Sequence, residues 1–241
     1  MKLRIRHTKL GKIRFTSHRD TARHWERAVR KAQVRLAYSA GFTPRPKLSF
    51  GLALPTGGES LAEYLDMELD PTEVPGDLAE FGARLGAELP VGYEIVRVAE
   101  RGNGSSLQDA VVACTWQVTM AGITHEQAAD AIAHFLAASE VLLERDRKGQ
   151  RATDDIRPSV ASLVLLPADT DPLGRPAVAA ELFTTGRSLR PVELTAALFP
   201  GADALDTAAR VLRTHQWIDD DGVRRELLPV EAVLHPITGS A

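Results

Sequence analysis

The chain has 241 residues, of which 44% are hydrophobic and 25% charged, proportions typical of a folded, water-soluble protein. No run approaches the roughly 18 apolar residues of a membrane span, and the first ten residues lack the apolar core of a signal peptide, so we expect a cytoplasmic protein. A single cysteine, Cys114, excludes an internal disulfide and a cysteine-built zinc or iron–sulfur site, and no cofactor is predicted.

The net charge of −3 conceals a strong asymmetry along the chain. Residues 1–50 hold 14 of the 29 basic residues and two of the 32 acidic ones, a charge of +12, which leaves −15 for residues 51–241. A basic end of this size predicts an anionic partner, and nucleic acid is the favoured one. The alternative is that the basic face pairs with the acidic remainder of the same chain.

The first fifteen residues predict extended structure. Residues 2–7 alternate between two faces, with Leu3, Ile5 and His7 on one and basic side chains on the other, which predicts a strand. Gly11 indicates a turn or bulge, and residues 12–15 then resume the alternation.

A helix is predicted over about residues 17–33, because Ser17-His18-Arg19-Asp20 is typical of a capping box. Apolar residues recur at helical spacing and predict a buried face made of Ala22, Trp25, Val29 and Ala32. A second stripe faces elsewhere and consists of Arg19, Arg23, Arg27 and Arg30.

The next segments complete a first unit. Two prolines and a glycine exclude regular structure from about residue 37 to 46, which predicts a loop. Residue patterns then predict strands at 47–54, 63–69 and 93–98 and a helix at about 76–88. The order β-α-β-β-α-β predicts an α+β, ferredoxin-like domain over residues 1–100, with one antiparallel sheet and both helices on one face.

Residues 101–109 are rich in glycine and serine and are predicted to be a linker. The remaining residues, 110–241, predict a second α+β domain, also of ferredoxin-like type but with weaker periodicity. Its expected elements are strands at 111–120, 141–144, 159–166 and 178–184, helices at 124–138 and from Arg190, a charged loop at 145–155, an undecided segment at 205–217 and a hairpin turn at 219–222.

Two long motifs carry a resemblance. They are Ser17-His18-x-Asp20 and Ala37-Tyr38-Ser39-x-Gly41-Phe42-x-Pro44-x-Pro46-x-Leu48-Ser49-Phe50-Gly51-x-Ala53-Leu54-Pro55-x-Gly57, continued by Glu59-Ser60 and Glu63-Tyr64-Leu65-Asp66. On these residues the chain resembles the radical-SAM-linked family of uncharacterised bacterial proteins, closely over about residues 2–100 and weakly beyond. That family commonly has Asn and His where this chain has Thr43 and Arg45, which argues against essential chemistry at those two side chains.

The resemblance implies a partner rather than a mechanism. Members of the family are fused to, or encoded beside, radical-SAM enzymes and have no settled activity. This chain is not the radical enzyme itself, because such an enzyme holds its cluster with three cysteines and this chain has one.

The candidate nucleic-acid site combines basic and aromatic side chains. The planar fork of arginine suits phosphate, and aromatic rings between the arginines offer stacking surfaces for bases. Alternation places Phe50 inward, and Asp66 and Glu68 on the outward face compete for some of the basic residues through cross-strand ion pairs. The candidates are Arg4, Arg6, Lys12, Arg14, Arg19, Arg23, Arg27, Arg30, Tyr38, Phe42, Arg45 and Lys47.

His18 and His24 are the alternative, catalytic candidates. The positive end of a helix keeps a nearby histidine neutral and able to accept a proton. The favoured interpretation is structural, with Asp20 in the cap and His18 in the first helical turn. No metal site is predicted, because no spacing of His7, His18 and His24 favours one.

Three functions stay open. The first is a non-catalytic RNA-binding or substrate-presenting partner of a radical-SAM enzyme, acting on transfer or ribosomal RNA or on a protein bound to it. The second is a metal-independent endoribonuclease like those that process CRISPR repeats, which also use tandem ferredoxin-like units. The third is a protein-only scaffold whose basic face docks an acidic partner.

Overall fold

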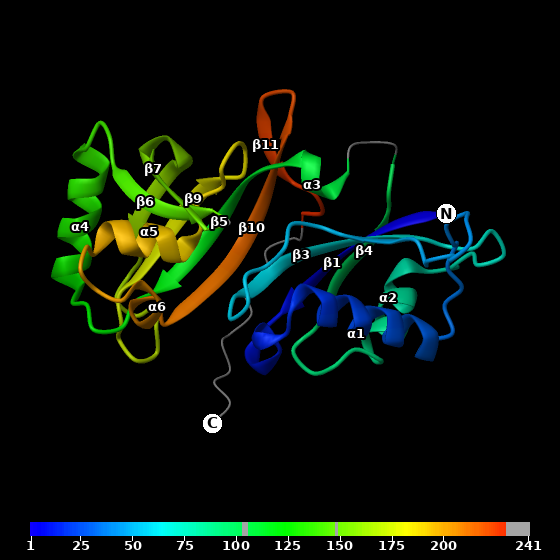
Figure 1. Ribbon diagram of the computed structural model, residues 1–241. Coiled ribbons are helices and arrows are strands. Elements are labelled where there is room, and N and C mark those ends of the chain that lie inside the picture. The colour runs from blue at the N-terminus through cyan, green and yellow to red at the C-terminus, as the bar shows by residue number, and fades with distance from the viewer. Residues whose placement is uncertain (103–105, 148, 230–241) are drawn as a thin grey trace.

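The structure is a computed structural model that describes residues 1–102, 106–147 and 149–229. Within these ranges, one large sheet runs through both halves of the chain and helices pack against it, an α+β architecture (Figure 1). The strands of this sheet are β1 (Lys2–Lys9), β2 (Leu48–Phe50), β3 (Glu59–Glu68), β4 (Ile95–Glu100), β5 (Val111–Thr119), β8 (Val160–Leu165), β9 (Ala177–Phe183), β10 (Arg210–Asp220) and β11 (Val223–Glu226).

The order of the main strands is β4-β1-β3-β10-β5-β9-β8, with β2 paired to β3 and β11 paired to β10. All neighbours are antiparallel except β3 and β10, which are parallel. The helices are α1 (His18–Lys31), α2 (Leu78–Gly86), α3 (Leu107–Ala110), α4 (His125–Ala137), α5 (Pro191–Leu198) and α6 (Ala204–Thr207), with 3-10 turns η1 (Gly11–Phe15) and η2 (Arg157–Ser159). Each helix of the described chain is too short or too polar to traverse a lipid bilayer.

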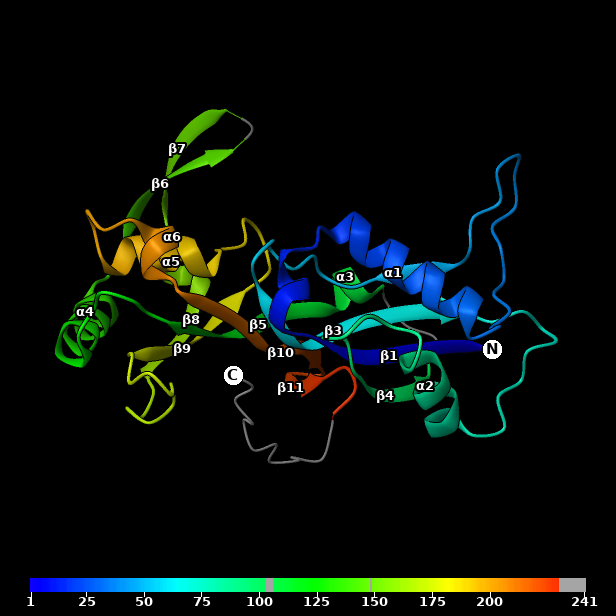
Figure 2. The same ribbon diagram turned by 90° about the horizontal axis from the view of Figure 1, so that it is seen from below.

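In the first half, α1 and α2 share one face of the sheet (Figure 2). Trp25 of α1 and Phe81 of α2 belong to the same buried cluster as Leu3 of β1 and Leu65 of β3. The predicted buried stripe of α1 is confirmed at Trp25, Val29 and Ala32, which are all buried. Burial of this apolar face holds the helix to the sheet.

The cap of α1 is also as predicted. The Ser17 hydroxyl accepts a hydrogen bond from the Asp20 backbone N–H at 3.1 Å and donates to the Asp20 carboxylate at 2.7 Å. The helix ends where Gln33 takes a left-handed conformation, with a φ of 55°, and the Val34 N–H donates back to the Val29 carbonyl.

Two strand predictions in this half are wrong. Residues 12–15 form the 3-10 turn η1, because Gly11 with a φ of 69° redirects the chain and the Thr16 N–H bonds back to the Ile13 carbonyl. The strand predicted at 47–54 pairs only over Leu48–Phe50. Beyond it the chain leaves the sheet, since Leu52 and Leu54 pack on the core of the second half.

In the second half, α4 and α5 contribute to one core with β5, β8 and β9. The predicted charged loop at 145–155 is wrong, because residues 145–147 and 150–155 belong to a separate hairpin of β6 (Leu142–Arg147) and β7 (Gln150–Asp155). The undecided segment at 205–217 contains α6 and most of β10. The predicted turn at 219–222 is confirmed, with the Gly222 N–H donating to the Asp219 carboxylate at 2.7 Å.

The two halves meet at β3 and β10. The first residues of β3 pair with β10, Glu59 opposite Leu212 and Ser60 opposite Arg213, while the last residues of β3 pair with β2. The predicted division into domains 1–100 and 110–241 stays a prediction. Of its linker, Asn103–Ser105 lie outside the described residues, and Leu107–Ala110 form α3.

Candidate functional site

Two of the predicted phosphate-binding arginines are used inside the protein. The Arg4 guanidinium donates to both carboxylate oxygens of Asp66, at 2.7 and 2.9 Å. Arg6 is 6% exposed and donates to the Glu226 carboxylate at 2.7 Å and the Leu228 carbonyl at 3.0 Å. Pairing and burial therefore remove these two side chains from the accessible basic surface.

Two further candidates are ion-paired but partly exposed. Arg14 lies 3.7 Å from the Glu59 carboxylate, and its guanidinium sits over the Phe15 ring, 4.6 Å from the ring centre. The Lys47 ammonium donates to the Glu68 carboxylate at 2.9 Å. The Arg14–Glu59 contact is long and the Lys47–Glu68 pair is exposed and therefore weak, so both basic side chains stay available to an anionic partner.

Four arginines of α1 form an accessible basic feature, which we term the α1 stripe: Arg19, Arg23, Arg27 and Arg30. Arg23 pairs with the exposed Asp20 at 3.1 Å. Arg19, Arg27 and Arg30 are exposed and have no carboxylate oxygen within 4.0 Å among the described residues. With a rise of 1.5 Å per residue, the stripe extends along about 16 Å of the helix surface.

A projecting loop follows the C-terminal end of α1 (Figure 2). This tip loop, residues 37–47, is closed by a bridge between Tyr38 and Pro46. The Ser39 N–H donates to the Arg45 carbonyl at 2.9 Å, and the Arg45 N–H donates to the Ser39 hydroxyl at 3.0 Å. Phe42 at its tip is fully exposed and Tyr38 is mostly exposed. Phe42 therefore does not anchor the loop on its own domain. Lys12 and Arg45 are exposed as well.

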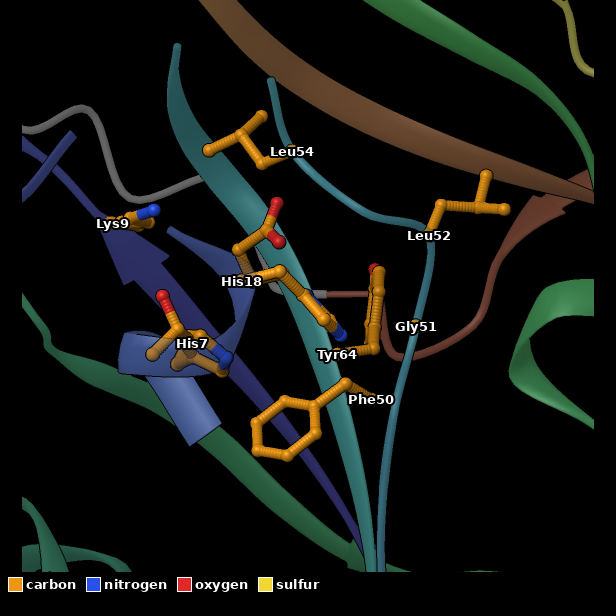
Figure 3. A pocket seen from close by; sticks show the side chains of 10 residues that line it. His7, Lys9, His18, Phe50, Gly51, Leu52, Leu54 and Tyr64 are labelled. Atoms are coloured by element: carbon orange, nitrogen blue, oxygen red, sulfur yellow. The ribbon is translucent and has the colours of Figure 1, made fainter. Parts of the chain in front are cut away.

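A small pocket, the α1 pocket, lies at the opposite end of α1 (Figure 3). Its polar lining comprises His7 and Lys9 of β1 and Glu63 of β3, with His18 from the first turn of α1. Leu52, Leu54 and Phe50 supply apolar walls, and Phe50 is half-buried against the core under α1. The interior of about 20 Å³ has room for about one water molecule.

The two catalytic candidates do not converge. His18 is exposed and lies edge-on to Phe50, with ring centres 5.6 Å apart. His24 is half-buried, and its Nδ1 lies 3.4 Å from the Tyr93 hydroxyl. Burial, and then the charge of Arg27, hold the pKa of His24 below its ordinary value of 6.5. Of the two, only His18 lines the α1 pocket.

Sequence reasoning missed the buried charges around this pocket. Arg213 of β10 is 1% exposed, yet its guanidinium bonds to the Glu63 carboxylate and to the Leu52 carbonyl at 2.9 Å. It also sits over the Trp116 ring, 5.3 Å from the ring centre. The sequence gives only a slight indication of these buried charges. Glu63 belongs to the second motif, and Lys9 continues the alternation of the first strand on its inward face.

Acid should destabilise the folded protein through His7. Burial holds the pKa of His7 below its ordinary value of 6.5, so the unfolded chain gains a proton before the folded one as the pH falls. We expect the free energy of unfolding to decline below about pH 6.5, by up to about 1.4 kcal/mol per pH unit for each such histidine. His24 and His215, whose pKa values are also lowered by burial, add to the decline.

Urea melts at a series of pH values measure this effect. The His7→Gln variant should lose part of the slope between about pH 5 and 6.5, whatever its stability at neutral pH. An unchanged slope would show that His7 does not titrate with folding.

Comparison with known proteins identifies a family for this chain, and the family has no described function. Residues 2–191 match the family model described as "Uncharacterized protein conserved in bacteria (DUF2344)". No curated protein matches. The chain is similar to a chain of a solved structure described as "Crystal Structure of a Cbf5-Nop10-Gar1 Complex", with 8% identity and a TM-score of 0.47. That match covers 89% of this chain and 48% of the other, and a likeness this distant supports no argument. The family match spans well over half of the chain, so the protein belongs to the bacterial family DUF2344.

Proposed function

We propose that this protein is a cytoplasmic RNA-binding or substrate-presenting partner of a radical-SAM enzyme, and that it holds RNA with the α1 stripe and the tip loop. One observation carries the proposal: Arg19, Arg27 and Arg30 are exposed on one helix and have no carboxylate partner in the described chain. Arginines arranged in this way can each take a phosphate without first breaking an ion pair.

The tip loop supports the same interpretation. It follows the C-terminal end of α1 and presents the exposed rings of Tyr38 and Phe42, together with the exposed Arg45. Base stacking on aromatic rings and phosphate binding by arginine are the two usual components of single-strand recognition. Loops held by a rigid scaffold often carry recognition.

Topology supports the ferredoxin-like assignment of both halves. The order β4-β1-β3-β2 with α1 and α2 on one face is the order that a β-α-β-β-α-β unit gives. The order β10-β5-β9-β8 with α4 and α5 repeats it, and the β6–β7 hairpin is then an insertion. The radical-SAM partner rests on the resemblance of the two motifs alone.

Salt dependence provides the test. If about six phosphates are neutralised, the logarithm of the association constant should fall with the logarithm of salt concentration with a slope near −4, that is about −0.7 per phosphate. Replacing Arg27 and Arg30 by glutamate should flatten this slope by more than one unit, because two contacts are lost. Arg151→Glu with Arg225→Glu, at exposed sites in the second half, changes the net charge equally and should leave the slope unchanged.

Removing the aromatic rings should act differently. Tyr38→Ala or Phe42→Ala should weaken binding by about 1–3 kcal/mol per lost stack and leave the salt slope as it is. Fluorescence anisotropy with a labelled single-stranded RNA measures both quantities. Absence of binding even at low salt would refute the RNA proposal and favour the protein-only scaffold. Metal-independent cleavage that His18→Ala abolishes would favour the endoribonuclease.

A further inference from the structure

The α1 pocket contains a buried lysine whose charge has no close counterion. Lys9 is 3% exposed, and its ammonium donates to the Thr16 carbonyl at 2.9 Å. No carboxylate oxygen lies within 4.0 Å of it in the described part of the chain. A lysine is almost never buried unless it is paired, because removing an ammonium from water is costly. An incoming anion would offset that cost.

The other charges of the pocket compensate the charge of Lys9 only in part. Glu63 is the carboxylate among the lining residues, and Arg213 binds it directly. His7 is buried with its Nδ1 3.0 Å from the Thr8 carbonyl, and its lowered pKa keeps it neutral at neutral pH. Burial lowers the pKa of Lys9 from its ordinary 10.5, while the more distant Glu63 acts in the opposite direction.

Size and wall chemistry restrict what can enter. The interior of about 20 Å³ accepts one oxygen of an anionic group, while the rest of the group lies at the mouth, and it does not accept a whole metabolite. Leu54, Leu52 and Phe50 lie around the pocket, and these apolar walls reduce the screening of charge by water, which strengthens the attraction between Lys9 and an anion. A phosphodiester within a strand is held by the chain on both sides, so a terminal phosphate, which is attached at one end only, can reach further into this recess.

We propose that the α1 pocket binds the terminal phosphate of an RNA strand, an inference that rests on the proposed RNA-binding function. His18 stands at the pocket and Arg19 follows it directly as the first member of the α1 stripe. In this proposal the strand leaves the pocket at the start of α1, crosses the helix at Arg19 and continues past Arg27 and Arg30 toward the tip loop. The pocket would fix the register of the strand, and the stripe would supply most of the affinity.

Oligonucleotides of one sequence with different ends test the proposal. Wild-type protein should bind the RNA with a 5′- or a 3′-terminal phosphate about tenfold more tightly than the same RNA with two hydroxyl ends, as expected for one charged contact. Lys9→Met should abolish this preference and leave the affinity for the hydroxyl-ended RNA within about twofold. Lys12→Met removes an equal charge from an exposed neighbour and should retain the preference.

Inorganic phosphate gives a second readout that needs no RNA. Because a ligand of the folded state raises its stability, the melting temperature of wild type should rise with phosphate relative to chloride at equal ionic strength. Lys9→Met should lose this rise. If the hydroxyl-ended and phosphate-ended RNAs bind wild type equally well, the pocket proposal fails while the proposed function stands. If neither RNA binds, both fail, and a rise with phosphate would then indicate a free phosphate ester as the ligand.

Discussion

Replacing Arg213 by alanine is expected to lower the free energy of unfolding by about 3–5 kcal/mol, the usual cost of breaking a buried ion pair. Arg213 neutralises Glu63, whose side chain is only 14% exposed, and it caps the Leu52 carbonyl at 2.9 Å. Without the guanidinium, a mostly buried carboxylate and a carbonyl lose their donors, and the contact with the Trp116 ring disappears. Chemical denaturation followed by circular dichroism measures the loss.

A double variant separates charge from packing at this site. Glu63→Gln with Arg213→Met removes both charges and keeps similar side-chain volumes, so it should be clearly more stable than Arg213→Ala. If the double variant is as unstable as the single one, the loss comes from packing, and the ion pair does not explain it.

Replacing Trp25 by alanine should also cost about 3–5 kcal/mol, because the side chain is completely buried and leaves a large cavity. The centre of its ring lies 4.7 Å from that of His7 and 6.5 Å from that of Tyr93. Removing the indole would therefore leave a cavity beside these two rings, between α1 and the sheet. Urea melts at neutral pH report the change. A neutral Trp25→Ala would show that the helix is not held to the sheet by this residue.

Trp25→Phe is the matched control. The indole N–H has no hydrogen-bond partner among the described residues, so removing it leaves no acceptor unsatisfied. The phenylalanine variant should therefore retain most of the stability that the alanine variant loses. Equal losses in the two variants would assign an essential role to the indole nitrogen.

The predictable parts of this fold depend on signals close together in the chain. A cap at Ser17 and apolar residues at helical spacing determine where α1 begins and which face it buries, and both were correctly predicted. Gly11 correctly predicts a turn. The four alternating residues after it, 12–15, are too few to establish a strand, and a 3-10 turn forms instead.

The unpredicted parts depend on residues distant in the chain. Arg6 alternates outward on β1, and its burial comes from a segment about 220 positions later, around Glu226 and Leu228. The Arg213–Glu63 pair arises in the same way, since the pairing of β3 with β10 brings together residues 150 positions apart. No local pattern encodes either contact. The exposure of the α1 stripe follows from its own helix and could be predicted.

The parallel pairing of β3 with β10 imposes an order of events on synthesis. Glu59 cannot pair until Leu212, about 150 residues downstream, has been synthesised. At a translation rate of about 5–20 residues per second, this takes about 8–30 s. Throughout it, the start of β3 presents an unpaired edge, and Arg6 and Glu63 lack their later partners. The nascent first half therefore exposes this strand edge and two unpaired charged side chains until the end of the chain has been made.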